Sequence, residues 1–236
     1  MARCRLAMSL VALALVTACA GSNVSDREVL VNEKLPRPDH IYVYDFAATP
    51  QDVPPDSALA GQVASGSPQT PDQIALGREV GAAIANELAS NIVAMGLPAE
   101  VVTPQTRFLV NDIVIRGYLL SYTAGNEAER LAVGMGAGAA EIKAAVEGFE
   151  MTPTGMRKLG SGNVDTAASK GPGAAVPLAV MLATKNPLGL IVSTGVNLHG
   201  EATGSSTIQG KAQDVAEEIA EQIRPRFEQQ GWIAPQ

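Results

Sequence analysis

Cysteine and histidine are nearly absent from this chain of 236 residues, which holds two of each. Both cysteines, Cys4 and Cys19, lie near the N-terminus, so the residues after Cys19 have no thiol for a disulfide, a nucleophile or a metal site. His40 and His199 lie far apart, and no HExxH, GxSxG, SxxK or GxxxxGK[ST] motif occurs. We therefore expect no metal, no cofactor and no catalysis, and an enzyme of an unrecognised class is the third of three hypotheses.

Positive charge and long apolar runs are also scarce. The 17 basic residues are outnumbered by 24 acidic ones, which gives a net charge of -7, and the basic residues form no stripe. Binding of nucleic acid needs clustered Lys and Arg to neutralise phosphates, so no nucleic-acid partner is expected. No apolar run reaches the roughly twenty residues that a helix needs to cross a bilayer. No feature of the sequence identifies a small-molecule substrate.

The N-terminal residues carry the strongest functional signal. Arg3 and Arg5 precede a short apolar segment, which is the order of a secretory signal peptide, and small residues ending in Ala18 and Cys19 follow. This segment resembles the bacterial lipobox, in which a diacylglycerol is attached to the cysteine and cleavage makes that cysteine the first residue. The resemblance implies that residues 1–18 are a signal peptide, that cleavage falls between Ala18 and Cys19, and that Cys19 carries the lipid. An ordinary secretory signal is the alternative.

The residues after the cysteine predict a destination and a tether. The sorting pattern of Gram-negative lipoproteins uses Asp directly after the cysteine to retain proteins in the inner membrane. This chain has Ala20 there, which implies delivery to the outer membrane, on its periplasmic face. Residues 19–39 are mostly polar and are expected to be a lipidated tether, able to reach roughly 60 Å when extended. A single domain should then occupy residues 40–236.

Strand patterns predict an α+β domain with a mixed sheet of about five strands. The centre is residues 112–151, which begin with a β-branched and aromatic run typical of a strand covered on both faces. Its last part alternates, with Ile142 and Val146 on one side and the acidic Glu141 and Glu147 on the other, so one face is expected to be wet. The other expected strands are residues 40–47, 99–103 and one ending near 170.

Two long helices are expected to pack on this sheet. The first begins with Thr70 as N-cap, Pro71 at the first helical position and Gln73 completing a capping box. Large apolar residues then recur every four positions beside a ridge of small ones, and this small ridge predicts close approach to a neighbouring element. The second helix is residues 211–230, amphipathic and closed by Gly231.

Three further features leave alternatives open. Gly134 and Gly136 fit the loose dinucleotide pattern GxGxxA, but no helix is expected after them, so a structural role in bends is preferred. The four tyrosines lie on two strands and either form a ligand-stacking face or serve packing. Five acidic residues are expected to be exposed, without spacing for a metal or an acid/base pair: Glu127, Glu129, Glu141, Glu147 and Glu150.

Residues 173–198 form a Gly/Ala-rich apolar insertion of two segments, each of about a dozen residues. Three interpretations are open: a helical hairpin packed on the domain, an element inserted shallowly into the outer leaflet, and an oligomer contact through its small residues. The first would make the insertion part of the core, and the other two would make it a membrane or protein contact.

Several blocks of the chain resemble one family. IYVYDFAATP, GNEAER, GMGAGAAE and AEEIAEQIRPRFEQQGWI, with the lipobox, resemble bacterial outer-membrane lipoproteins of the domain of unknown function 4410 family. The family implies no reaction or substrate. We expect a lipid-anchored, non-catalytic adaptor or assembly factor of the cell envelope, with a protein partner or homo-oligomer besides the membrane. The alternative is a membrane-active or ring-forming subunit of a secretion or pore-type complex.

Overall fold

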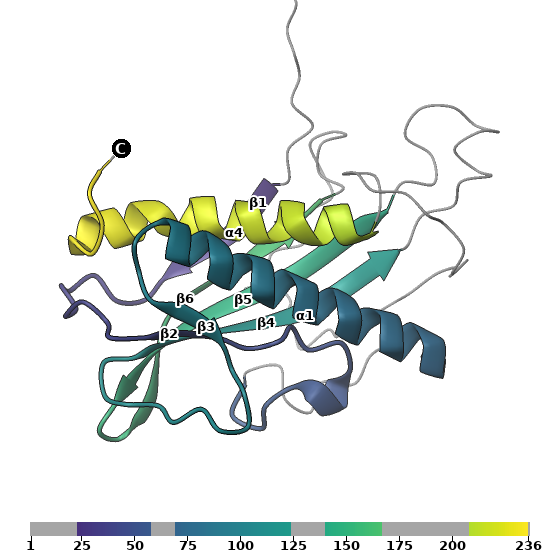
Figure 1. Cartoon of the computed structure of the whole chain (residues 1–236), viewed down its shortest axis with the longest axis horizontal. Coiled ribbons are helices and arrows are strands. Elements are labelled where there is room, and N and C mark those ends of the chain that lie inside the picture. The colour runs from purple at the N-terminus through teal and green to yellow at the C-terminus, as the bar shows by residue number, and fades with distance from the viewer. Residues whose placement is uncertain (1–22, 58–68, 124–139, 167–207, 236) are drawn as a thin grey trace, which may run out of the picture.

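The computed structural model describes residues 23–57, 69–123, 140–166 and 208–235. Six strands form one mixed sheet in the order β1-β6-β5-β4-β2-β3, and two long helices lie side by side on one of its faces (Figure 1). The elements are β1 (Asn23–Val29), β2 (Ile41–Val43), a short 3-10 helix η1 (Pro50–Asp52), α1 (Pro71–Ala94), β3 (Ala99–Val101), β4 (Ile113–Thr123), β5 (Glu141–Thr152), β6 (Gly155–Asp165) and α4 (Ile208–Gln230).

The sheet divides into a parallel and an antiparallel part. β2 pairs in parallel with both β3 and β4, whereas β4, β5, β6 and β1 form successive antiparallel pairs. β4 is an interior strand, and residues 113–119 are buried although their side chains point alternately to the two faces. The prediction of a central strand covered on both faces is therefore confirmed.

The predicted number of about five strands is wrong, because the sheet has six. The additional strand is β1, which falls inside the predicted tether and pairs with β6 from Asn23↔Asp165 to Val29↔Gly160. Its sequence, NVSDREV, has no alternating apolar residues, and its pairing is interrupted by a bulge between Ser25 and Glu28. Backbone hydrogen bonding at a sheet edge does not require an apolar face, so this strand gives no hydrophobic pattern.

Helix α1 begins as the sequence predicts. The Thr70 side chain accepts from the Gln73 amide, and the Gln73 side chain accepts from the Thr70 amide, so both halves of the capping box are present. The small ridge brings the helix onto the chain after β2, where the Phe46 amide donates to the Gly81 carbonyl at 3.2 Å. A Cβ at Gly81 would collide with the backbone oxygen of Phe46, so the close approach requires glycine there.

The main core lies between the two helices and the sheet. α1 contributes Ile84, Leu88 and Ile92, and α4 contributes Val215 and Ile219, all of them buried. Strands β2, β4 and β5 supply the opposing side chains. The apolar insertion at residues 173–198 and the glycine cluster at residues 134–138 lie outside the described residues.

Candidate functional site

An apolar cavity of about 170 Å³ lies between the C-terminal half of α4 and four strands of the sheet. The strands are β4, β5, β6 and β1, and the residues just after β1 close one side. Most of its wall is made of aliphatic and aromatic side chains, among them Ile113, Ile115, Val146, Leu159, Ile223 and Phe227. A cavity of this kind is the usual form of a ligand site.

Glycines in the sheet explain why the space under α4 is not filled. Gly148 of β5 lines the cavity, and a Cβ built on it would meet no atom within 4 Å. Gly160 of β6 also lines it, and there a Cβ would collide with the backbone oxygen of Glu28 in β1. The first glycine leaves volume empty, and the second lets β1 approach β6 closely.

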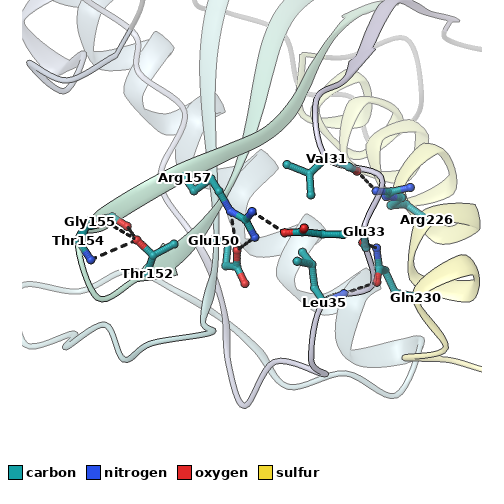
Figure 2. Close-up of polar contacts among 10 residues, drawn as sticks. All are labelled: Val31, Glu33, Leu35, Glu150, Thr152, Thr154, Gly155, Arg157, Arg226 and Gln230. Carbon is teal, nitrogen blue, oxygen red and sulfur yellow. Dashed lines mark hydrogen bonds and ion pairs between the residues drawn. The ribbon is translucent and has the colours of Figure 1, made fainter.

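The chain after β1 forms one wall of the cavity, and we call residues 31–35 the strap. Gln230, at the end of α4, accepts from the Leu35 amide at 2.7 Å and donates to the Glu33 carbonyl at 3.0 Å. Arg226 donates to the Val31 carbonyl (Figure 2). The Trp232 indole donates to the Leu35 carbonyl at 3.2 Å. Three side chains from the C-terminal end of α4 and the residues just after it therefore hold the strap through its backbone.

A second contact ties the strap to the sheet. The Arg157 guanidinium of β6 contacts Glu150 of β5 at 2.5 Å and 3.0 Å, and it contacts Glu33 of the strap at 2.5 Å (Figure 2). The hydrogen bonds that Arg157 donates to Glu150 and Glu33 raise its pKa above the ordinary value. Because Glu150 is 5% exposed, the prediction that it is an exposed carboxylate is wrong. It serves as a buried partner for the arginine that crosses to the strap.

The opposite face of the sheet carries a buried polar cluster. Glu147 accepts from the Tyr118 hydroxyl at 2.8 Å and the Ser57 hydroxyl at 3.4 Å, and it pairs with Lys158 at 2.9 Å. Burial, together with the negative charge of Glu147, raises the pKa of Tyr118. Glu147 is only 2% exposed, so the prediction of a wet face at this position of β5 is wrong. Residues of the loop that contains η1 cover that face.

Arg116 of β4 extends this arrangement. It pairs with Asp56 at 2.9 Å, and its guanidinium lies 5.4 Å from the ring centre of Tyr44 and 5.2 Å from that of Phe149. Both ring contacts are within the range of cation–π attraction. The charged side chains of this cluster are paired with each other, and most of them are covered. Its effect is to hold the loop that contains η1 against the sheet.

The tyrosines do not form one ligand-stacking face. Tyr42 and Tyr44 pack against Phe108, whereas Tyr118 bonds to Glu147. Tyr122 instead donates to the Gln73 carbonyl at the start of α1. The four rings are therefore divided between the two faces of the sheet and serve packing and hydrogen bonding.

The predicted cleavage and lipidation residues, Ala18 and Cys19, lie outside the described part of the chain, and so does His199. His40 is described, and its Nδ1 atom lies 3.5 Å from Asp112, a carboxylate that is 1% exposed. Within the described ranges, no three His, Cys, Asp or Glu side chains are grouped to hold a metal ion. No helix of those ranges is both long and apolar enough to cross a membrane.

A family model described as Domain of unknown function (DUF4410) matches residues 41–185. No curated protein matches the chain.

Two solved structures are similar over part of the chain. The PelC dodecamer from Paraburkholderia phytofirmans in space group P6 shares 13% sequence identity, with a TM-score of 0.35, over 61% of this chain and 79% of that one. A leucine-to-methionine variant of that dodecamer in space group C2 shares 15% identity, with a TM-score of 0.33, over 61% and 78%. These similarities are too distant to bear on the assembly or activity of the present protein.

Proposed function

The chain belongs to the DUF4410 family, and from this premise we propose that it is a lipid-anchored, periplasm-facing lipoprotein of the outer membrane that works as a non-catalytic adaptor or assembly factor. Its folded domain serves as a binding module in this proposal. The cavity under α4 is its binding site.

The single observation that carries the binding role is the apolar cavity itself. Its wall is built by α4, four strands and the strap, and its interior is apolar with polar groups at a few positions. Such a site holds a ligand by excluding water from apolar surface and orients it through a few polar groups. The side chains that hold the strap bond to its backbone, which keeps this wall in place.

The proposed anchor is supported by the sequence around Cys19. The lipobox-like residues end at Cys19, and β1 starts at Asn23. Four residue steps span at most about 14 Å, because an extended chain advances at most about 3.6 Å per residue. An acyl group on Cys19 would therefore hold the folded domain close to the membrane. The reach of roughly 60 Å expected from a free tether is too long, since β1 is part of the sheet.

Metabolic labelling and membrane fractionation in a Gram-negative host test the anchor. We expect wild-type protein to incorporate a palmitate analogue and to fractionate with the outer membrane. The Cys19→Ser variant should lose the label. The Ala20→Asp variant should keep the label and move to the inner membrane, because only the sorting residue has changed. Labelling of Cys19→Ser at the wild-type level would overturn the proposal.

A protease protection assay tests which side of the membrane the domain faces. A periplasmic domain should resist added protease in intact cells and be digested once the outer membrane is permeabilised. Digestion in intact cells would contradict the periplasmic orientation. An Ala20→Asp protein gives the matched control, since it too should be protected in intact cells.

A further inference from the structure

We propose that the cavity under α4 binds the end of an unbranched fatty carboxylate, with the aliphatic chain inside and the carboxylate at the mouth. This inference rests on the proposed binding function and adds the chemical class of the ligand. It depends on three properties of the site: the interior is apolar, the volume is small, and the charged side chains around it are mainly positive.

The interior suits an aliphatic chain because its walls offer little for a polar ligand. Val146 of β5 and Leu159 of β6 line the space from the sheet, Ile223 lines it from α4, and Gly148 leaves open room above the sheet. A volume of about 170 Å³ is close to the roughly 150 Å³ of an apolar cavity that accepts benzene. It therefore suits the end of one chain and is too small for a sterol or for a whole phospholipid. The remainder of the ligand would lie at the mouth.

The charged residues of the lining favour an anionic head group. Arg27 and Arg226 line the cavity together with a single acidic residue, Glu28. Arg226 donates to neutral oxygens, those of Val31 and Gln229, and Glu28 accepts from a serine hydroxyl. No ion pair to either arginine forms among the described residues. A carboxylate at the mouth would supply a negative partner to guanidinium groups that have none, in a chain whose net charge is -7.

Photolabelling of the full-length anchored protein in nanodiscs of phosphatidylethanolamine and phosphatidylglycerol tests the inference. The probe is decanoic acid carrying a diazirine near the end of its chain, and the labelled residues are mapped by mass spectrometry. We expect label on Val146, Leu159 and Ile223. A decylamine with the same diazirine should label these residues at least fivefold less, because its ammonium would meet the two arginines.

Matched variants separate the cavity from general membrane contact. Gly148→Leu fills the open room above the sheet, and Val146→Phe is a second filling variant should the first fail to fold. Both should reduce cavity label about tenfold. Val93→Phe makes the same change on the solvent side of α1, where Val93 is 53% exposed, and should leave the label unchanged. Arg27→Gln should reduce labelling by the acid about fivefold and should raise labelling by the amine, whose ammonium then meets one guanidinium fewer.

Several results would overturn the inference. If Leu159 and Ile223 are labelled as strongly in the filled variants as in Val93→Phe, the probe does not enter the cavity. Equal labelling by the acid and the amine would show that the site does not prefer an anionic head group. Labelling that appears only in Cys19→Ser would show that the acyl group of the chain itself fills the space. The palmitate readout at Cys19 is independent of all these results, so failure of the anchor and failure of the ligand are distinguishable.

Discussion

The side-chain amide of Gln230 accepts a hydrogen bond from the backbone of Leu35 at 2.7 Å, across 195 positions of sequence. Its nitrogen donates to the Glu33 carbonyl at 3.0 Å. Gln230 is 8% exposed, so one buried amide satisfies a donor and an acceptor of the strap at once. This relationship makes the last turn of α4 responsible for the position of one wall of the cavity.

Replacing that amide should loosen the strap. Gln230→Leu supplies an apolar side chain of similar size but leaves the two backbone groups unpaired. Such a loss costs about 1–3 kcal/mol for a group that water cannot reach and less for one that it can. We expect a loss of about 2 kcal/mol in the free energy of unfolding, measured with urea, and faster hydrogen exchange at the Leu35 amide. Gln229→Leu, at the exposed neighbouring position, should change both quantities little. Unchanged exchange at Leu35 in Gln230→Leu would contradict this role.

Elements with strong local signals were predicted well. The capping box at Thr70 and the four-residue spacing of α1 specify a helix before any tertiary contact, and α4 follows from its amphipathic pattern. The DUF4410 family resemblance is confirmed by the match over residues 41–185. Local signals of this kind depend only on residues a few positions apart.

Several features that depend on distant residues were not predicted. The pattern of β5 gives the face to which Glu147 points, but not the loop that covers that face and brings Ser57 to it. The edge strand β1 has no alternating apolar residues that would predict a strand. The cavity is lined by Gly148 and Gly160, and isolated strand glycines, the one available hint, do not reveal what lies next to them. The position of the cavity is therefore set by the three-dimensional arrangement of the strands and α4.

The buried pair of Glu147 and Lys158 should respond unequally to removal of either partner. The Glu147 side chain is 2% exposed, whereas that of Lys158 is 23% exposed and can reach water. Lys158→Met leaves a buried carboxylate without its cation, and loss of one partner of a buried pair costs about 3–5 kcal/mol. Glu147→Gln leaves the ammonium free to turn toward solvent and should cost less. Urea unfolding of both variants measures the difference, and an equal loss would contradict the explanation.

The exposed pair of Asp52 and Arg78 should make a smaller contribution that depends on pH. Burial favours the neutral acid, but hydrogen bonds from Arg78 and Thr49 prevail and lower the pKa of Asp52 below its ordinary 3.8. Because the folded-state pKa lies below the unfolded one, the stabilisation is complete above the unfolded value and is lost as the pH falls through the folded value. Asp52→Asn should therefore cost up to about 1 kcal/mol at pH 7.

That difference between wild type and Asp52→Asn should shrink as the pH falls below about 3.8, where protonation removes the charge in the wild type as well. Urea unfolding at several pH values from 7 to 2.5 measures it. Glu79→Gln, at an exposed position of α1, gives the control and should change the free energy of unfolding little at pH 7. A difference that stays constant down to pH 2.5 would show that the pKa of Asp52 is not involved.

Two glycine-to-alanine substitutions should have opposite effects on stability. In an open helix position alanine is favoured over glycine by about 1 kcal/mol, but a Cβ at Gly81 would collide with the backbone oxygen of Phe46. Overpacking of this kind costs about 1–3 kcal/mol, so Gly81→Ala should lower the free energy of unfolding. Gly148→Ala places its methyl in open space above β5 and should leave stability unchanged or raise it. Thermal and urea unfolding of the two variants measures both effects. A Gly81→Ala protein as stable as the wild type would mean that α1 does not need its close approach to the chain after β2.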